Sequence, residues 1–195
     1  MVKTRLEAFS DGVFAIIITI MVLELKVPHG SEWADLTALW AKFSSYVLSF
    51  VFVGIYWVNH HHMIHAVKQV NGSMMWGNLN LLFWLSLIPF VTSWMGENHF
   101  SAHPVAAYSI VLFLCAISYR ILQNIITRSH NYPEAITRAF KKSMSKAVLS
   151  MVLYVVAFGF TFINTGVSAI LFLTVSFLWM IPDRNLERAM KEIME

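Results

Sequence analysis

The residues best suited to chemistry in this sequence lie in two short polar clusters within long apolar stretches. Residues 5–12 read RLEAFSDG, so Arg5, Ser10 and Asp11 bring a cation, a hydroxyl and a carboxylate to the start of an apolar run. The second cluster is NHHH at residues 59–62. Such groups can transfer protons, pair with one another or bind a cation. An ionisable residue inside a membrane span is a functional-site hypothesis by default.

The composition indicates that membrane-spanning helices position these two clusters. Of 195 residues, 57% are hydrophobic and only 13% are charged, whereas about a quarter of the residues of a soluble domain are charged. A helix needs about 20 apolar residues to cross the hydrocarbon core. The sequence therefore predicts an all-α polytopic membrane protein with six transmembrane helices, at residues 7–25, 38–59, 77–95, 105–127, 147–163 and 165–181.

The connections between these spans carry further signals. Pro89 lies within the third span and predicts a kink, because proline cannot donate the helical hydrogen bond to residue i−4. Only NTG, residues 164–166, divides the fifth span from the sixth, which predicts a tight helical hairpin. Residues 128–142 are expected to form a basic loop. Residues 1–195 are interpreted as one six-helix domain, with residues 183–195 as a short cytoplasmic tail that can form an amphipathic helix.

The basic residues predict the orientation of the chain. Lys and Arg are retained on the cytoplasmic side of membrane proteins. With the N-terminus in the cytoplasm, all of the 14 Lys and Arg except Lys26 and Lys42 fall on that side. We therefore expect a multi-pass protein of the cell membrane with both termini cytoplasmic. The net charge of +3 then reflects topology, which argues against nucleic acid as a partner.

The first span has two different faces. At about 100° per helical residue, one stripe is apolar except for a single hydroxyl, while Asp11 points to another side. The second span runs back through the membrane, so its polar end reaches the depth of Ser10 and Asp11. A buried network is expected there, because polar groups persist in low dielectric only when they are paired. The stripe consists of Gly12, Ile16, Thr19, Ile20 and Leu23, and the expected network partners are Arg5, Asp11, Asn59, His60 and His61.

These motifs resemble those of the endolysosomal potassium channel family, transmembrane protein 175. The resemblance is carried by RLEAFSDG at residues 5–12, WVNHH at residues 57–61 and NLLFWLSLIPFVTSWMGE at residues 80–97. The R-x-x-x-F-S-D signature is distinctive, and the similarity covers all six spans. More specifically, the chain looks like a prokaryotic member with a single six-helix unit.

The resemblance implies a potassium-selective cation channel, moderately selective over sodium, and not an enzyme. It implies a symmetric homo-oligomer, a tetramer, whose central pore is lined by the first helix. It also implies an apolar side-chain constriction in place of a carbonyl filter, and the chain indeed has no TVGYG motif. Carried over by position, the pore residues are Ile16 as the narrowest ring, Thr19 as a hydroxyl layer, and Ile20 and Leu23 as further apolar layers. The bracing signature corresponds to Arg5, Phe9, Ser10 and Asp11.

Two other functions stay open on the residues alone. A proton or cation carrier would use Asp11 and the cluster from His60 to His62. A membrane metalloenzyme is less favoured, because eight histidines are too few for several spaced histidine boxes. We expect no metal site and no cofactor, with potassium only as the permeant ion. The expected partners are further copies of the chain and the lipid bilayer.

Overall fold

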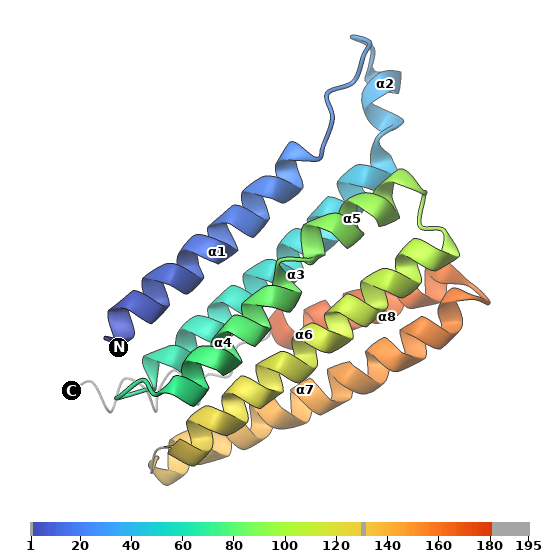
Figure 1. Cartoon of the computed structure of the whole chain (residues 1–195). Helices are drawn as coiled ribbons and strands as arrows, with labels where there is room; N and C mark the ends of the chain where they lie inside the picture. Colours follow the sequence, from blue (N-terminus) through green and yellow to red (C-terminus); the bar gives the residue numbers. More distant parts are fainter. Residues whose placement is uncertain (1, 130–131, 181–195) are drawn as a thin grey trace.

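The computed structural model describes residues 2–129 and 132–180, and within these ranges it consists of helices and their connections (Figure 1). No strand occurs in this part of the chain. The long segments run alternately in opposite directions along one bundle, with α4 and α5 following one another in the same direction (Figure 1). Their bounds are α1 Lys3–Leu23, α2 Trp33–Thr37, α3 Trp40–His65, α4 Gly72–Leu85, α5 Ile88–Glu97, α6 Ala102–Ser129, α7 Glu134–Thr161 and α8 Thr165–Met180.

The predicted membrane-protein class is confirmed by the lengths of these helices. Within the described residues, five segments are long and apolar enough to cross a membrane: α1, α3, α4 with α5, α6, and α7. The sixth expected span, α8, is also apolar but has 16 residues. At 1.5 Å per residue it is about 24 Å long. The short helix α2, between α1 and α3, was not predicted and lies at the far end of the bundle from the N-terminus (Figure 1).

The predicted kink in the third span is confirmed and divides it into α4 and α5. Helix α4 ends at Leu85, and α5 begins at Ile88 with Pro89 in its first turn. Because Pro89 has no N–H, the carbonyl of Leu85 receives no i−4 bond from it. In the intervening turn, the Ser86 hydroxyl donates to the carbonyl of Phe83 at 2.7 Å. The span therefore bends beside α1, against which α4 and α5 both pack.

The predicted hairpin between the last two spans is confirmed, whereas the predicted loop before them is wrong in part. Helix α7 ends at Thr161 and α8 begins at Thr165. Residues 128–142 were expected to be a loop, but α7 already begins at Glu134. Its first turns are polar and are stabilised by an ion pair of 2.7 Å between Arg138 and Glu134, one turn apart. The predicted tail, residues 183–195, lies outside the described residues.

Helix α1 lies at one edge of the bundle and packs through a single face (Figure 1). It contacts α3, α4 and α5. On the opposite side of the bundle, α6 is buried along its whole length between α4, α5, α7 and α8. The outer face of α1 is left uncovered by the other helices that the structure describes. The buried residues of α1 are Leu6, Ser10, Phe14, Ile17 and Met21.

The backbones of α3 and α5 approach each other closely at Gly96. A Cβ atom added there would lie 2.5 Å from Ser45 Oγ and 2.9 Å from Lys42 Cα. In membranes, small residues allow such close approach, and the resulting van der Waals packing holds helices together. Because one of the two clashing atoms belongs to a backbone, the helices themselves would have to separate to admit a side chain.

We expect Gly96→Ala to lower the free energy of unfolding in detergent by about 1–3 kcal/mol, the usual cost of overpacking. Gly54→Ala on α3 is the matched control, since nothing lies within 4 Å of its added Cβ. Alanine also has the higher helix propensity, so the control should be neutral or stabilising. Thermal unfolding of both variants measures the difference. Equal melting temperatures would contradict a tight contact between α3 and α5.

Candidate pore helix and its supporting network

Three buried polar side chains from three helices form a hydrogen-bonded chain behind α1. The side-chain amide nitrogen of Asn78, on α4, donates to Ser10 Oγ on α1 at 3.0 Å. The Asn78 amide oxygen lies 2.6 Å from Nε2 of His60 on α3. All three residues are at most 2% exposed. We call Ser10, Asn78 and His60 the polar triad.

The bonds of the polar triad fix the proton on His60. Ser10 donates its only hydroxyl proton to the carbonyl of Leu6 at 2.9 Å. Its oxygen must therefore accept from the Asn78 NH₂ group, which leaves the Asn78 oxygen facing His60. Because that oxygen can only accept, His60 carries a proton on Nε2 and donates it. Every bond in the triad is thus directional, and Asn78 links Ser10 to His60.

The polar triad also fixes the rotation of α1 about its axis. Ser10 can reach Asn78 only when its own face of α1 points into the bundle. The neighbouring Phe14 then packs its ring against His60, with ring centroids 5.5 Å apart. A buried polar group without a partner costs about 1–3 kcal/mol, so rotating α1 out of this register is expensive. The triad therefore positions the opposite face of α1.

Asp11 lies outside this buried chain. Its carboxylate accepts a hydrogen bond of 2.9 Å from the indole Nε1 of Trp57 on α3, and both residues are exposed. Within residues 2–129 and 132–180, no ion pair involves Asp11 or Arg5. The partner of Asp11 is on the second span, as the sequence suggests, but it is a tryptophan and not a histidine.

The other expected network residues have separate contacts. Asn59 donates its amide to the carbonyl of Ile55 in its own helix at 2.8 Å. The ring of His61 lies beside those of Trp57 and His65, at centroid distances of 6.4 and 5.9 Å. In the described part of the chain, no three His, Cys, Asp or Glu side chains are grouped as a metal site. The structure thus brings Ser10 together with His60 and places Asn59 and His61 elsewhere on α3.

The four pore residues expected from the sequence all lie on the uncovered face of α1. Ile16 is 57% exposed and Leu23 is 79% exposed, while Ile20 and Thr19 are exposed too. This stripe lies about 130° around the helix from the buried face that carries Ser10. The Thr19 hydroxyl donates to the carbonyl of Ile16 at 2.9 Å, so its oxygen lone pairs are available on the exposed side.

Arg5 and Phe9 lie on this same face. They precede Ile16 by about three and two helical turns, which places them within about 20° of it around the helix. Both are exposed. The Arg5 guanidinium makes no hydrogen bond to the described part of its own chain. The uncovered face of α1 therefore runs from a cation at its start, through apolar side chains and a hydroxyl, to Leu23 at its end.

Both ends of α1 are tied to neighbouring helices. At the start, Lys3 Nζ donates to the carbonyl of His65, the last residue of α3, at 2.6 Å. Just past the end, Glu24 accepts a bond of 3.3 Å from Ser93 on α5. The helix is therefore held at its start, near its middle by the polar triad, and at its end.

Two contact residues were not predicted from the sequence. Asn78 is the centre of the polar triad, and Trp57 is the donor to Asp11. A signal for Asn78 exists, because it is one of two asparagines in the charge-free stretch GNLNLL, and polar residues in membrane spans usually face the bundle interior. Trp57 lies within the WVNHH motif. Tryptophan is common at membrane interfaces, so its presence there does not indicate which residue its indole N–H bonds.

Comparisons with known proteins connect this arrangement to a family. The model of a family described as "Endosomal/lysosomal potassium channel TMEM175" matches residues 5–89. A protein named as a potassium channel from Chryseobacterium sp. (strain P1-3) is 49% identical over 192 residues, which cover 98% of this chain and 100% of that protein. One so named from Streptomyces collinus (strain DSM 40733 / Tue 365) is 34% identical over 170 residues, 82% of each chain.

The fold is also similar to a solved structure, the crystal structure of a lysosomal potassium-selective channel TMEM175 homolog from Chamaesiphon minutus. The TM-score is 0.82 at 26% sequence identity, and the match covers 92% of this chain and 96% of that one. Sequence similarity over nearly the whole chain and the same arrangement of helices therefore agree. The protein belongs to the TMEM175 family, whose members are ion channels and not enzymes.

Proposed function

We propose that this protein is a potassium-selective cation channel of the cell membrane, in which copies of α1 surround a central pore. One observation carries the proposal. The stripe of Ile16, Thr19, Ile20 and Leu23 is turned away from its own bundle by a buried polar triad on the other side of the helix. The bacterial relatives are named as potassium channels, which supports potassium as the permeant ion. A symmetric tetramer places the same stripe of each copy on the axis.

The proposed constriction is a ring of Ile16 side chains. An apolar ring excludes water when it is narrow and passes a partly dehydrated cation when it widens, which is gating by dewetting. Potassium holds its water less strongly than sodium, so it loses part of its shell at lower cost. Ile20 and Leu23 add apolar layers, and the exposed oxygen of Thr19 is the one side-chain ligand in the stripe. Moderate potassium preference follows.

The signature residues around the polar triad are proposed to brace the pore helix. Within one protomer, Ser10 and His60 do so directly through Asn78. Asp11 contributes through Trp57. Arg5 and Phe9 lie on the face that neighbouring copies would share, so their bracing contacts are proposed to be between copies. Asn59 and His61 support the same end of the bundle from α3.

The proposed orientation follows the distribution of charge. The described Lys and Arg gather at the end of the bundle where α1 begins, and only Lys26 and Lys42 lie at the other end. We infer that the N-terminus and residues 183–195 are cytoplasmic and that residues 1–195 form one channel domain. The carrier alternative has less support, because Asp11 bonds Trp57 and lies apart from the buried bond of His60.

Cysteine accessibility tests whether the stripe lines a pore. The chain has a single cysteine, Cys115, which is buried, so background modification is low. In reconstituted channels, Ile16→Cys and Leu23→Cys should lose current when a charged thiol reagent is added, because the adduct lies in the permeation path. Ile170→Cys, equally exposed but on α8, is the control and should keep its current. Equal insensitivity of all three would overturn the proposed pore.

A further inference from the structure

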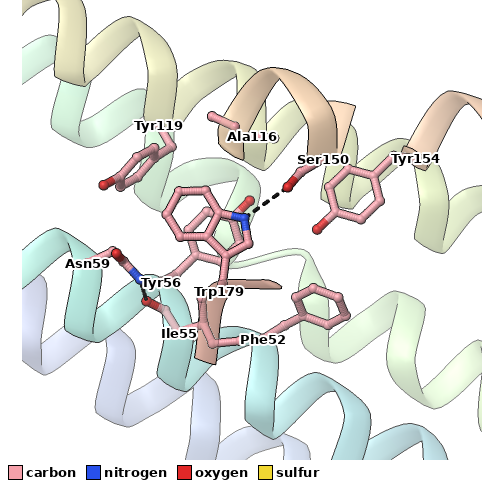
Figure 2. Close-up of a pocket in the computed structure, with 10 residues that line it drawn as sticks. Phe52, Ile55, Tyr56, Asn59, Ala116, Tyr119, Ser150, Tyr154 and Trp179 are labelled. Atoms are coloured by element: carbon pink, nitrogen blue, oxygen red, sulfur yellow. Dashed lines mark hydrogen bonds between the residues drawn. The ribbon is translucent and has the colours of Figure 1, made fainter. Parts of the chain in front are cut away.

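A second polar feature lies far from α1, in a cavity between α3, α6, α7 and α8 (Figure 2). Its volume is about 20 Å³, which is room for about one water molecule. None of the described residues that line it belongs to α1. Its walls are largely aromatic and include the rings of Phe52, Tyr56, Tyr119, Tyr154 and Trp179.

Two tyrosine hydroxyls border this cavity without a partner. Tyr56 is 9% exposed and Tyr154 is 2% exposed. Neither hydroxyl has a hydrogen bond to any residue in the described part of the chain. Both hydroxyl oxygens also keep some accessible surface. Neither is among the fully enclosed side-chain atoms of the described residues that lack a hydrogen bond. Figure 2 shows the Tyr154 hydroxyl pointing toward Trp179, inside the group of lining side chains.

The other polar groups around the cavity have partners. The indole Nε1 of Trp179 donates to Ser150 Oγ at 2.9 Å. The amide nitrogen of Asn59 donates to the carbonyl of Ile55 at 2.8 Å, and both bonds are drawn in Figure 2. The hydroxyl of Tyr119 bonds the side chain of Ser143. The side chain of Asn59 lies on the other side of Trp179 from Tyr154 (Figure 2). The two unused hydroxyls, those of Tyr56 and Tyr154, thus belong to residues that line one small cavity.

We infer that this cavity binds a single water molecule, held by the hydroxyls of Tyr56 and Tyr154. Burying a hydroxyl without a hydrogen bond is costly, and buried polar groups nearly always have a protein or water partner. A buried water typically makes two to four bonds, and these two hydroxyls supply two of them. The water joins α3 to α7 beside Trp179, whose ring packs edge-on against Tyr119 at 5.9 Å.

The chemistry of the site selects a small neutral ligand. No described lining residue is charged, and the Lys146 ammonium already lies 5.9 Å from the centroid of the Trp179 ring, so a second cation would be repelled. The volume excludes anything much larger than water. The site is also independent of the proposed pore, because its residues lie on helices other than α1. Loss of this water should therefore loosen the seam between α3, α7 and α8 without changing which ion passes.

Radiolytic hydroxyl-radical footprinting of the wild-type channel tests the site without any substitution. An ordered water beside a buried tyrosine yields radicals that modify the ring. Tyr56 and Tyr154 should be modified several-fold faster than Tyr108, which is fully buried but whose hydroxyl bonds Ser49 directly at 2.9 Å. Equal modification rates of the three tyrosines would overturn the inference.

Phenylalanine substitutions give a second test, because a hydrated cavity and a dry cavity predict different changes in the melting temperature. If water is bound, Tyr56→Phe and Tyr154→Phe should each lower the melting temperature by about 2–4 °C. The double variant should lose less than the sum, because the second change removes a bond to a water already weakened by the first. In a dry cavity each substitution removes an unpaired polar group, and the melting temperature would rise or stay unchanged. That result would overturn the inference.

Discussion

Ile16→Asn is expected to raise the single-channel conductance and to remove most of the preference for potassium over sodium. The substitution replaces an apolar ring by amides that can hydrate or coordinate the passing ion. This lowers the dehydration barrier, and it lowers it more for sodium, which holds its water more tightly. A decrease of about 1.4 kcal/mol in the barrier corresponds to a roughly tenfold larger current. Reversal potentials under bi-ionic conditions and unitary currents measure both effects.

Two companion variants separate the constriction from other causes. Thr19→Val deletes the only hydroxyl of the stripe without widening it, so it should lower selectivity with little gain in conductance. Ile170→Asn introduces the same amide at a similarly exposed position on α8; it should reduce expression and leave selectivity unchanged. Intact currents with wild-type selectivity in both Ile16→Asn and Thr19→Val would exclude α1 from the pore.

Asn78→Leu is expected to have the largest effect on stability, lowering the free energy of unfolding by about 2–5 kcal/mol. The side chains are similar in size, so the substitution leaves little empty space. It leaves the donor of His60 and the acceptor of Ser10 without partners in a buried site, and each unsatisfied group costs about 1–3 kcal/mol. Thermal unfolding and size-exclusion profiles in detergent measure the loss of fold and of assembly.

Asn124→Leu on α6 is the matched control for this prediction. Asn124 is half-buried, and its side chain makes no hydrogen bond to the residues that the structure describes. The control should unfold within about 0.5 kcal/mol of wild type, as substitutions away from special contacts usually do. If Asn78→Leu were equally mild, the polar triad would not be what fixes the rotation of α1.

The spans of this fold could be predicted from sequence because the bilayer imposes their length and apolarity. The start of α7 could not, because residues 134–146 lie outside the apolar pattern, and polar residues fit a helix or a loop equally well. The kink was predictable from Pro89 alone, since the missing N–H acts within one helix. A single sequence thus reveals those features of the helices that the bilayer or one residue's own covalent structure imposes.

The partners within the site depend on contacts between helices, which a single sequence does not show. His60 and His61 are neighbours, yet only His60 is buried. A signal was present, because His60 follows the buried Tyr56 by one helical turn on the inner face of α3. The bond from Asn78 to Ser10 spans 68 positions and depends on how α4 is set against α1. The grouping of Ile16, Thr19, Ile20 and Leu23 on one stripe of α1 was predictable because it needs only the helical period, whereas what faces that stripe was not.

The most direct test of a potassium channel is a recording of the purified wild-type protein in a planar bilayer, with potassium on one side and sodium on the other at equal concentration. The account predicts stepwise unitary currents and a reversal potential displaced from zero toward the value for potassium. A reversal potential at zero would contradict potassium selectivity. Saturable flux without unitary steps would contradict a channel and indicate a carrier.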